Sequence, residues 1–365
     1  MTRHEPVLAE AVTRLAVGSR RVVDGTVGSG GHAERFRAAG AEVLAVDRDA
    51  EALARARAIL GDEGIRWLHG SFGGRAVLDE IARFRPDFIL LDLGVSSEQL
   101  DNDGRGFSFR LGAPLDMRMG AAGESAAELL NGTPESELAR IFSEYGDERR
   151  ARRLASEVGR RRAREAFAIS DDLVNAIRAV LGPRSGPAVF ARLFQAVRIA
   201  VNDELGELGR ALPVMREALP PGGTLAVISY HSGEDRIVKR LFKEWARACI
   251  CPPALPVCTC RGRPLGVIDP RKPVLPDADE IAANPRARSA KRARRREILH
   301  LRDHRALEMA RRRGQRDPLP LLQRAPVPGR HPQPAEGDVA QEETCTSNRR
   351  SQRRSQCREI EDRYA

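Results

Sequence analysis

The sequence has no apolar run long enough to span a bilayer, and its first residues, MTRHEPVLAEAV, lack the apolar core of a signal peptide. Aromatic residues make up only 4% of the chain, which argues against a broad stacking surface for single-stranded nucleic acid. The chain has 6 cysteines in 365 residues, and without an export signal we expect reduced thiols or metal ligands rather than disulfides. These absences predict a cytoplasmic protein with no membrane partner.

Positive charge is in excess. The formal net charge is +10, and a surplus of this size favours a polyanionic partner. The hydrophobic content of 41% is enough for a folded core, and the length allows one large domain or two of ordinary size.

Residues 20–94 alternate between strand-like and helix-like segments. We expect strands within 20–26, 41–47, 65–70 and 87–94, and helices within 31–40 and 49–61. The segment DFILLDLG is a continuous apolar run, as strands of a parallel sheet require. The alternation predicts an open, doubly wound α/β sheet.

The alternation stops after about residue 105. Residues 106–187 are arginine-rich and have a helical pattern. The pattern predicts one long helix over 190–219 and a further strand within 220–232. We therefore predict a sheet domain in two parts, 1–105 and 188–297, interrupted by an inserted all-helical domain at 106–187, whose arginines suit contact with the phosphates of a nucleic acid such as RNA. The basic, proline-rich tail, 298–365, has few apolar residues and is predicted to be disordered.

The segment VVDGTVGSGGH, residues 22–32, follows the first predicted strand and places four glycines within seven positions. Gly28, Gly30 and Ala33 match the dinucleotide fingerprint, with Asp47 downstream for a ribose. S-adenosylmethionine-binding loops instead carry an acid, here Asp24, at the end of the first strand. A carboxylate in that place would repel a pyrophosphate, so the loop favours S-adenosylmethionine. A glycine turn without a ligand, and a role for Asp47 as a helix cap, remain alternatives.

A wider set of motifs points to one family. In order, the chain contains HEPVLAEAV, DGTVGSGGH, LLDLGVSSEQLD, RGFSFR, PLDMRM, FQAVRIAVNDEL, SYHSGEDRIVK and NPRARSAKRAR. Together, over roughly residues 4–297, they resemble the ribosomal RNA small subunit methyltransferase H family. Glu98, Tyr230 and Gly233 depart from the usual proline, phenylalanine and leucine of that family.

The resemblance implies a Rossmann-like class I methyltransferase fold and transfer of a methyl group from S-adenosylmethionine. The implied acceptor is the N4 amino group of a decoding-centre cytidine in 16S rRNA, within the small ribosomal subunit. The cofactor positions of the family fall on Gly30, Gly31, His32, Asp47, Phe72, Asp92 and Gln99. Asp47 is placed to accept the ribose hydroxyls and Phe72 to pack on adenine, although Phe72 also suits ordinary core packing.

The amino group of cytosine is a weak nucleophile, so the reaction needs an acceptor for its proton. The Asn/Asp-Pro-Pro-aromatic motif of many amino-methylating enzymes is absent. DLGVSS offers Asp92, Ser96 and Ser97 instead, and SYHSGEDR offers His231 with two acids. We predict Asp92, Ser96 and His231 as catalytic residues. Ser232 and Asp235 form a potential capping box, so helix capping is an alternative for part of the second cluster.

The cysteine cluster and the basic segments each allow two interpretations. Cys249, Cys251, Cys258 and Cys260 suit zinc, but their C-x-C spacing is not the usual C-x-x-C, and no metal is included in the predicted site. The basic run Arg149 to Arg164 and the segment 284–297 are either solvated surface or phosphate contacts.

The competing functions are a catalytically silent RNA-binding assembly factor and, on the literal glycine match alone, a nicotinamide oxidoreductase. The sequence leaves the oligomeric state open.

Overall fold

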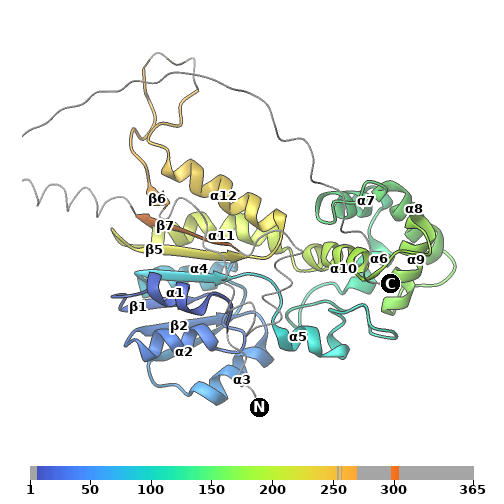
Figure 1. Cartoon of the computed structure of the whole chain (residues 1–365), viewed down its shortest axis with the longest axis horizontal. Helices are drawn as coiled ribbons and strands as arrows, with labels where there is room; N and C mark the ends of the chain where they lie inside the picture. The colour runs from blue at the N-terminus through green and yellow to red at the C-terminus, as the bar shows by residue number, and fades with distance from the viewer. Residues whose placement is uncertain (1–5, 253–254, 256, 269–296, 304–365) are drawn as a thin grey trace, which may run out of the picture. The chain divides into compact units, whose positions relative to one another are not determined.

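The alternating strands assemble into one sheet. In the computed structural model, which describes residues 6–252, 255, 257–268 and 297–303, seven strands lie in the order β3-β2-β1-β4-β5-β7-β6 (Figure 1). All of these residues belong to one compact unit, Met1–Asp317. Strands β1 to β5 are parallel to one another, and at one edge β7 is antiparallel to β5 and β6 is antiparallel to β7. The strands are β1 (Arg21–Asp24), β2 (Glu42–Asp47), β3 (Ile65–His69), β4 (Phe88–Asp92), β5 (Thr224–Ser229), β6 (Gly266–Ile268) and β7 (Glu297–Asp303).

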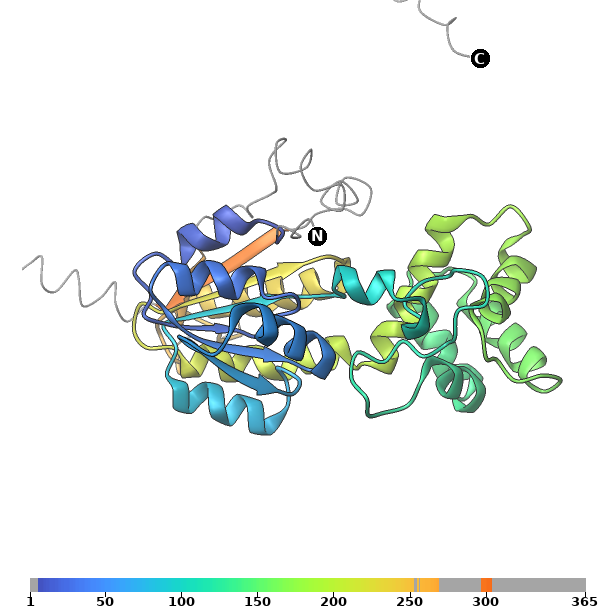
Figure 2. The same ribbon diagram turned by 90° about the horizontal axis from the view of Figure 1, so that it is seen from below.

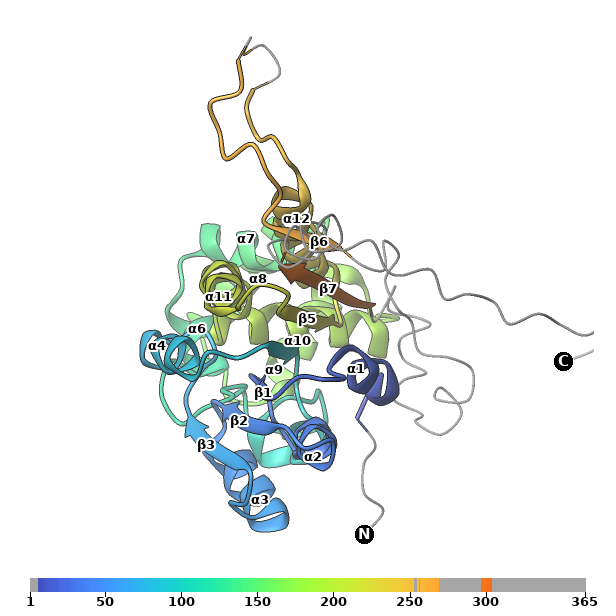
Figure 3. The same ribbon diagram turned by 90° about the vertical axis from the view of Figure 1, so that its left-hand side faces the viewer.

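Helices cover both faces of this sheet (Figure 3). Successive residues of a strand point to opposite faces, so Val22 and Val43 pack in one apolar cluster while Val23 and Leu44 pack in another. The first face carries α1 (Ala9–Leu15), α2 (Gly31–Ala38) and α3 (Ala50–Leu60), and the second carries α4 (Arg75–Phe84), α11 (Glu204–Ala218) and α12 (Ser232–Ala246). This arrangement confirms the predicted α/β sheet.

A helical segment interrupts the sheet between β4 and β5 and has its own apolar core (Figure 2). Residues 106–187 contain no strand, as predicted, apart from one isolated bridge between Pro114 and Ile169. Phe142 and Leu154 are fully buried there, and Phe194 of the following helix packs in the same core. The helices are α5 (Ser97–Asp101), the 3-10 helix η1 (Asp103–Arg105), α6 (Ala126–Gly132), α7 (Glu135–Glu144), α8 (Ala151–Arg162), α9 (Ser170–Leu181) and α10 (Pro187–Val201).

The single long helix predicted over 190–219 is wrong, because the structure has two helices, α10 and α11. The chain breaks at Asn202 and at Asp203, whose φ is 46°. The buried Asn202 side chain accepts a hydrogen bond from the backbone N–H of Met119 and donates one to the carbonyl of Met117. A tertiary contact with a loop 83 residues away therefore stabilises the end of α10, at an Asn-Asp pair whose residue types tolerate non-helical backbone.

The start of the predicted disordered tail is also wrong. Residues 298–303 belong to β7, which pairs with β5 along Thr224–Ser229 and with β6 on its other side. A strand of this kind obtains its hydrogen bonds from neighbours distant in sequence, which composition does not reveal. The rest of the tail, 304–365, and the basic segment 284–296 lie outside the described residues. None of the described helices is both long and apolar enough to cross a membrane.

Candidate active site

A cavity of about 810 Å³ lies at the carboxyl ends of the parallel strands. Ligands of open α/β sheets bind at this edge, where the strand order reverses between β1 and β4. The lining comes from residues 25–29 after β1, Asp47 and Arg48 at the end of β2, Phe72 after β3, residues 92–96 at the end of β4, and Tyr230 after β5.

The predicted cofactor residues gather around this one cavity. Gly31, His32, Asp47, Phe72, Asp92 and Gln99 all line it. Gly30 is the exception: it forms the N-cap of α2 with φ 87°, and a Cβ there would lie 2.8 Å from Leu60 Cδ1. Gly30 thus lets α2 approach α3 closely, while its neighbours face the cavity.

Asp47 holds the glycine loop. Its carboxylate accepts hydrogen bonds of 2.8 Å from the backbone N–H groups of Gly28 and Asp49. The cap of α3 is Asp49, which accepts from the N–H groups of Glu51 and Ala52. The alternative that Asp47 is the helix cap is therefore wrong. Burial raises the pKa of the Asp47 carboxyl, and the two N–H donors oppose that shift.

Asp92 lies where the loops after β1, β4 and β5 meet. Its backbone N–H donates to Thr26 Oγ1 at 2.7 Å, and its Oδ1 accepts a 2.6 Å hydrogen bond from Tyr230 Oη. Its Oδ2 lies 3.8 Å from His32 Nε2. These contacts fix the carboxylate at the wall of the cavity.

Two buried ionisable groups lie under the glycine loop. Asp24 is 1% exposed, and burial raises the pKa of its carboxyl to about 7, with the charge of Asp92 adding to the shift. His32 is 5% exposed, and burial lowers the pKa of its imidazole to about 3, with the charge of Arg35 adding to the shift. Around neutral pH His32 is thus an uncharged imidazole beside Asp92, and Asp24 is near its titration midpoint.

Ser96 is used as a helix cap. Its Oγ accepts from the backbone N–H of Gln99, and Gln99 Oε1 accepts in return from the N–H of Ser96. Gln99 Nε2 also donates to Asp49 Oδ2, which pairs with Arg105 at 3.0 Å. This chain of contacts ties the loop after β4 to the start of α3, so Ser96 and Gln99 shape the cavity as well as line it.

His231, predicted as a catalytic residue, is the N-cap of α12 and is absent from the cavity lining. Its Nδ1 accepts from the backbone N–H of Gly233, and its Nε2 lies 3.1 Å from Glu234 Oε1. The capping box is thus His231 with Glu234, and the predicted pair of Ser232 with Asp235 is wrong. Asp235 pairs instead with Lys239. Glu234, 2% exposed, lines the cavity, and its hydrogen bond from His231 lowers the pKa of its carboxyl against the effect of burial.

Several residues that line the cavity are not among the predicted site residues, and Tyr230 and Glu207 are two of them. Tyr230 was noted only as a departure from a family pattern, although its position directly after β5 was a signal for a site residue. Glu207 of α11 accepts from Ser71 Oγ and lies 3.5 Å from Arg48 Nη1. Nothing in the sequence marks Glu207, because its segment was read as the middle of one long helix.

Some arginines of the basic run Arg149 to Arg164 make contacts within the helical segment itself. Arg160 and Arg161 both pair with Glu157, and Arg162 donates to the carbonyls of Leu130 and Thr133. The exposed arginines of the same run include Arg152, Arg153 and Arg164.

Comparison with known proteins identifies the family. The model of the MraW methylase family matches residues 1–296. The chain belongs to the MraW methylase family. A relative from Gemmatimonas aurantiaca, named ribosomal RNA small subunit methyltransferase H, is 54% identical over 296 residues, covering 80% of this chain and 94% of the relative. A relative of the same name from Heliobacterium modesticaldum is 46% identical over 302 residues, covering 79% and 96%.

These findings confirm the resemblance and the class I methyltransferase fold. The methylase uses S-adenosylmethionine, as the acid ahead of its glycine loop predicts.

The residues of the cavity fit this cofactor. The loop of residues 25–31 offers backbone to the ligand, and at Gly31 a Cβ would come within 3.0 Å of Pro6. The adenosyl group needs an acceptor for its ribose and an apolar surface for its base, and Asp47 and Phe72 line the same cavity.

Proposed function

We propose that this methylase transfers a methyl group to the N4 amino group of a cytidine in small-subunit ribosomal RNA, at the decoding centre. The observation that carries the proposal is the fixed Asp92 carboxylate at the cavity wall, held by Tyr230 and Thr26. The relatives named as ribosomal RNA small subunit methyltransferases support the substrate class.

In this proposal Asp92 accepts a hydrogen bond from N4–H. The interaction returns electron density to the amino nitrogen and draws off the proton that leaves as the new N–C bond forms. When bound, S-adenosylmethionine would supply the methyl group by cleavage of its sulfonium S–CH3 bond and leave as S-adenosylhomocysteine. Tyr230 orients the carboxylate by its hydrogen bond to Oδ1, while Asp47, Phe72 and the glycine loop hold the cofactor. Ser96 and His231 act through the positions of α5 and α12.

Methylation at the ring carbon C5 is the nearest alternative chemistry, and it normally uses a cysteine nucleophile. Among the described residues no cysteine lines the cavity. The four described cysteines lie together in the loop of residues 249–260. The side chains around the cavity therefore favour an exocyclic amino group as the acceptor.

We propose that the helical segment binds the RNA. A second cavity, of about 260 Å³, is lined by three arginines of this segment, but the acids Glu165 and Asp172 line it as well. The exposed Arg152, Arg153 and Arg164 are therefore the candidate phosphate contacts. The target base must leave its stack to reach a methyl donor at the end of the sheet, which favours an already irregular region of folded RNA.

The test is product identification. Small subunits from a strain that lacks the modification are incubated with the enzyme and labelled S-adenosylmethionine, and the RNA is digested to nucleosides for mass spectrometry. N4-methylcytidine is expected, at a single decoding-centre position when RNA fragments are sequenced. 5-Methylcytidine, or label on a different base, would contradict the proposal. RNA binding without any methyl transfer would favour the silent assembly factor.

A further inference from the structure

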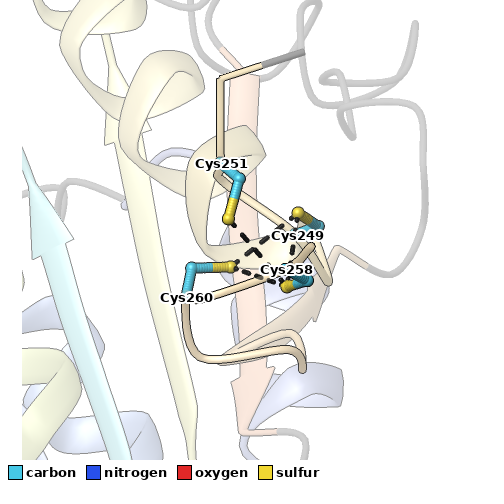
Figure 4. A group of neighbouring side chains, drawn as sticks. All are labelled: Cys249, Cys251, Cys258 and Cys260. Carbon is cyan, nitrogen blue, oxygen red and sulfur yellow. Dashed lines mark hydrogen bonds between the residues drawn. The ribbon is translucent and has the colours of Figure 1, made fainter. Parts of the chain in front are cut away.

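The loop between α12 and β6 brings four cysteine side chains to one point (Figure 4). The sulfur atoms of Cys249, Cys251, Cys258 and Cys260 all lie within 4.8 Å of one another. Four of the Sγ–Sγ distances are 3.7 Å (249–258), 3.9 Å (251–258), 3.5 Å (258–260) and 3.8 Å (249–260).

These distances match the edges of a metal–thiolate tetrahedron. With a Zn–S bond of about 2.3 Å, neighbouring sulfurs of a tetrahedral site lie about 3.8 Å apart. A disulfide needs about 2.05 Å, so the arrangement is not that of bonded pairs. A multi-iron cluster would hold its thiolates farther apart, because irons and sulfides would lie between them.

Hydrophobic packing does not explain why the four side chains converge. Cys249 and Cys258 are exposed, Cys251 and Cys260 are intermediate, and the apolar side chains near them, Ile250, Leu255 and Val257, are 41–69% exposed. The loop extends away from the sheet (Figure 3), and four thiols in a segment without a core do not hold one another. A bond to a common centre supplies the missing constraint.

We propose that Cys249, Cys251, Cys258 and Cys260 form a structural zinc site. Four thiolates in tetrahedral order, with no position left for water, are typical of a structural rather than a catalytic zinc. On binding, each thiol releases its proton to solvent and donates a sulfur lone pair to the metal, so four protons are exchanged for one zinc ion with no change of oxidation state. The backbone N–H of Ile250 donates to Cys260 Sγ at 3.3 Å, a contact that also stabilises a metal-bound thiolate.

The proposed zinc site lies in the connection between α12 and β6. Beside Cys260, Arg261 donates to the carbonyls of Glu244 and Arg247 at the end of α12. A few residues later the N–H of Leu265 donates to the carbonyl of Trp245 at 2.7 Å, just before β6 begins. A metal that closes the loop of residues 249–260 therefore fixes the direction in which the chain leaves α12 and enters the sheet edge.

The first experiment is metal analysis of the full-length chain, purified under reducing conditions from a zinc-supplemented culture. We expect one zinc per chain by plasma mass spectrometry. The Cys258→Ser variant should lose at least nine-tenths of the zinc, because Cys258 is in contact with all three other sulfurs. The matched control is the Cys345→Ser and Cys357→Ser double variant, which removes the other two cysteines and should retain the zinc.

A second measurement keeps the test independent of whether a variant folds. Wild-type protein is stripped with a chelator and titrated with Co²⁺, and four thiolates should give the intense d–d bands near 600–750 nm that are typical of tetrahedral sulfur coordination. Cys258→Ser should weaken these bands and shift them to the blue. Wild-type protein that contains iron in place of zinc, or no metal, or that gives an octahedral cobalt spectrum, would overturn the proposal. So would zinc retained by Cys258→Ser. None of these results depends on methyl transfer, so the zinc site and the proposed function fail separately.

Discussion

The hydroxyl of Tyr230 donates a 2.6 Å hydrogen bond to the Oδ1 atom of Asp92, across 138 residues of sequence. Each residue stands at the carboxyl end of a different strand, β5 and β4, and these strands are neighbours in the sheet. The parallel pairing therefore brings an acceptor and its orienting donor to one wall of the cavity, although the whole helical segment separates them in sequence.

Asp92→Asn should abolish most of the methyl transfer while leaving the fold intact. An amide cannot draw off the N4 proton, so we expect kcat to fall by about 100-fold or more, with little change in KM for the RNA. Tyr230→Phe removes only the orienting bond, and a loss of about tenfold is expected. Single-turnover methyl transfer measures both, with Asp79→Asn as control, a half-buried acid of α4 that pairs with Arg75. Equal rates for Asp92→Asn and the wild type would remove Asp92 from the mechanism.

Asp47→Ala should weaken binding of S-adenosylmethionine. The carboxylate holds Gly28 of the glycine loop and is the predicted acceptor for the ribose, so a loss of about 2–3 kcal/mol, or about 30- to 150-fold in Kd, is expected. Calorimetry with the cofactor measures this, and Asp62→Ala, which removes an exposed acid paired with Arg57, is the control. An unchanged Kd would show that Asp47 serves the loop alone.

Replacing Arg152, Arg153 and Arg164 by Gln should weaken RNA binding and leave cofactor affinity unchanged. If each arginine contacts a phosphate, the slope of log K against log salt should become shallower by about 2. The control replaces Arg57, Arg75 and Arg83, exposed arginines of the helices that cover the sheet, and removes the same total charge. Identical salt slopes for the two triple variants would mean that these three arginines lie on a solvated surface and do not contact the RNA.

The pH dependence of stability should show two opposing contributions. Burial raises the pKa of Asp24 to about 7, so between about pH 4 and 7 the folded state keeps a proton that the unfolded state loses, and stability falls as pH rises. Burial lowers the pKa of His32 to about 3, so between about pH 3 and 6.5 only the unfolded state binds that proton, and stability rises with pH. The two slopes offset each other between about pH 4 and 6.5.

Asp24→Asn removes one of these slopes and exposes the other. The free energy of unfolding of the variant should rise relative to the wild type by up to about 1.4 kcal/mol per pH unit between pH 4.5 and 6.5. Urea denaturation at three pH values in this window measures the difference. Parallel pH profiles for the two proteins would show that Asp24 does not keep its proton in the folded state.

A chain truncated before β7 should be less stable than a chain truncated after it. A chain that ends at residue 296 lacks β7, which leaves β5 without its antiparallel partner and β6 without any partner. We expect its Tm to lie about 5–10 °C below that of a chain ending at residue 303. Thermal unfolding followed by circular dichroism compares the two, and equal Tm values would show that β7 adds nothing to the sheet.

The sequence by itself determined the architecture around the cofactor. The apolar runs predict β1 to β4, because buried parallel strands need continuous apolar residues. The glycines between the runs mark the turns, because a turn residue with positive φ, such as Gly30, favours glycine. The acid at position 24 ahead of those glycines distinguished a methyl donor from a dinucleotide by charge alone. The motifs also placed Asp47, Phe72 and Asp92 at strand ends, which meet at one edge in any parallel sheet.

Only the tertiary structure decided features that depend on contacts between distant residues. The break between α10 and α11 depends on the bonds from Asn202 to the loop at residues 117–119, and β7 exists because β5 offers it an edge. The helix caps also depend on the tertiary structure. Asp49, and not Asp47, caps α3. The capping box of α12 is His231 with Glu234, and not Ser232 with Asp235. Local pattern determines which segments are apolar and where they turn, but it does not record which distant partner satisfies a polar group, and those partners shape the site.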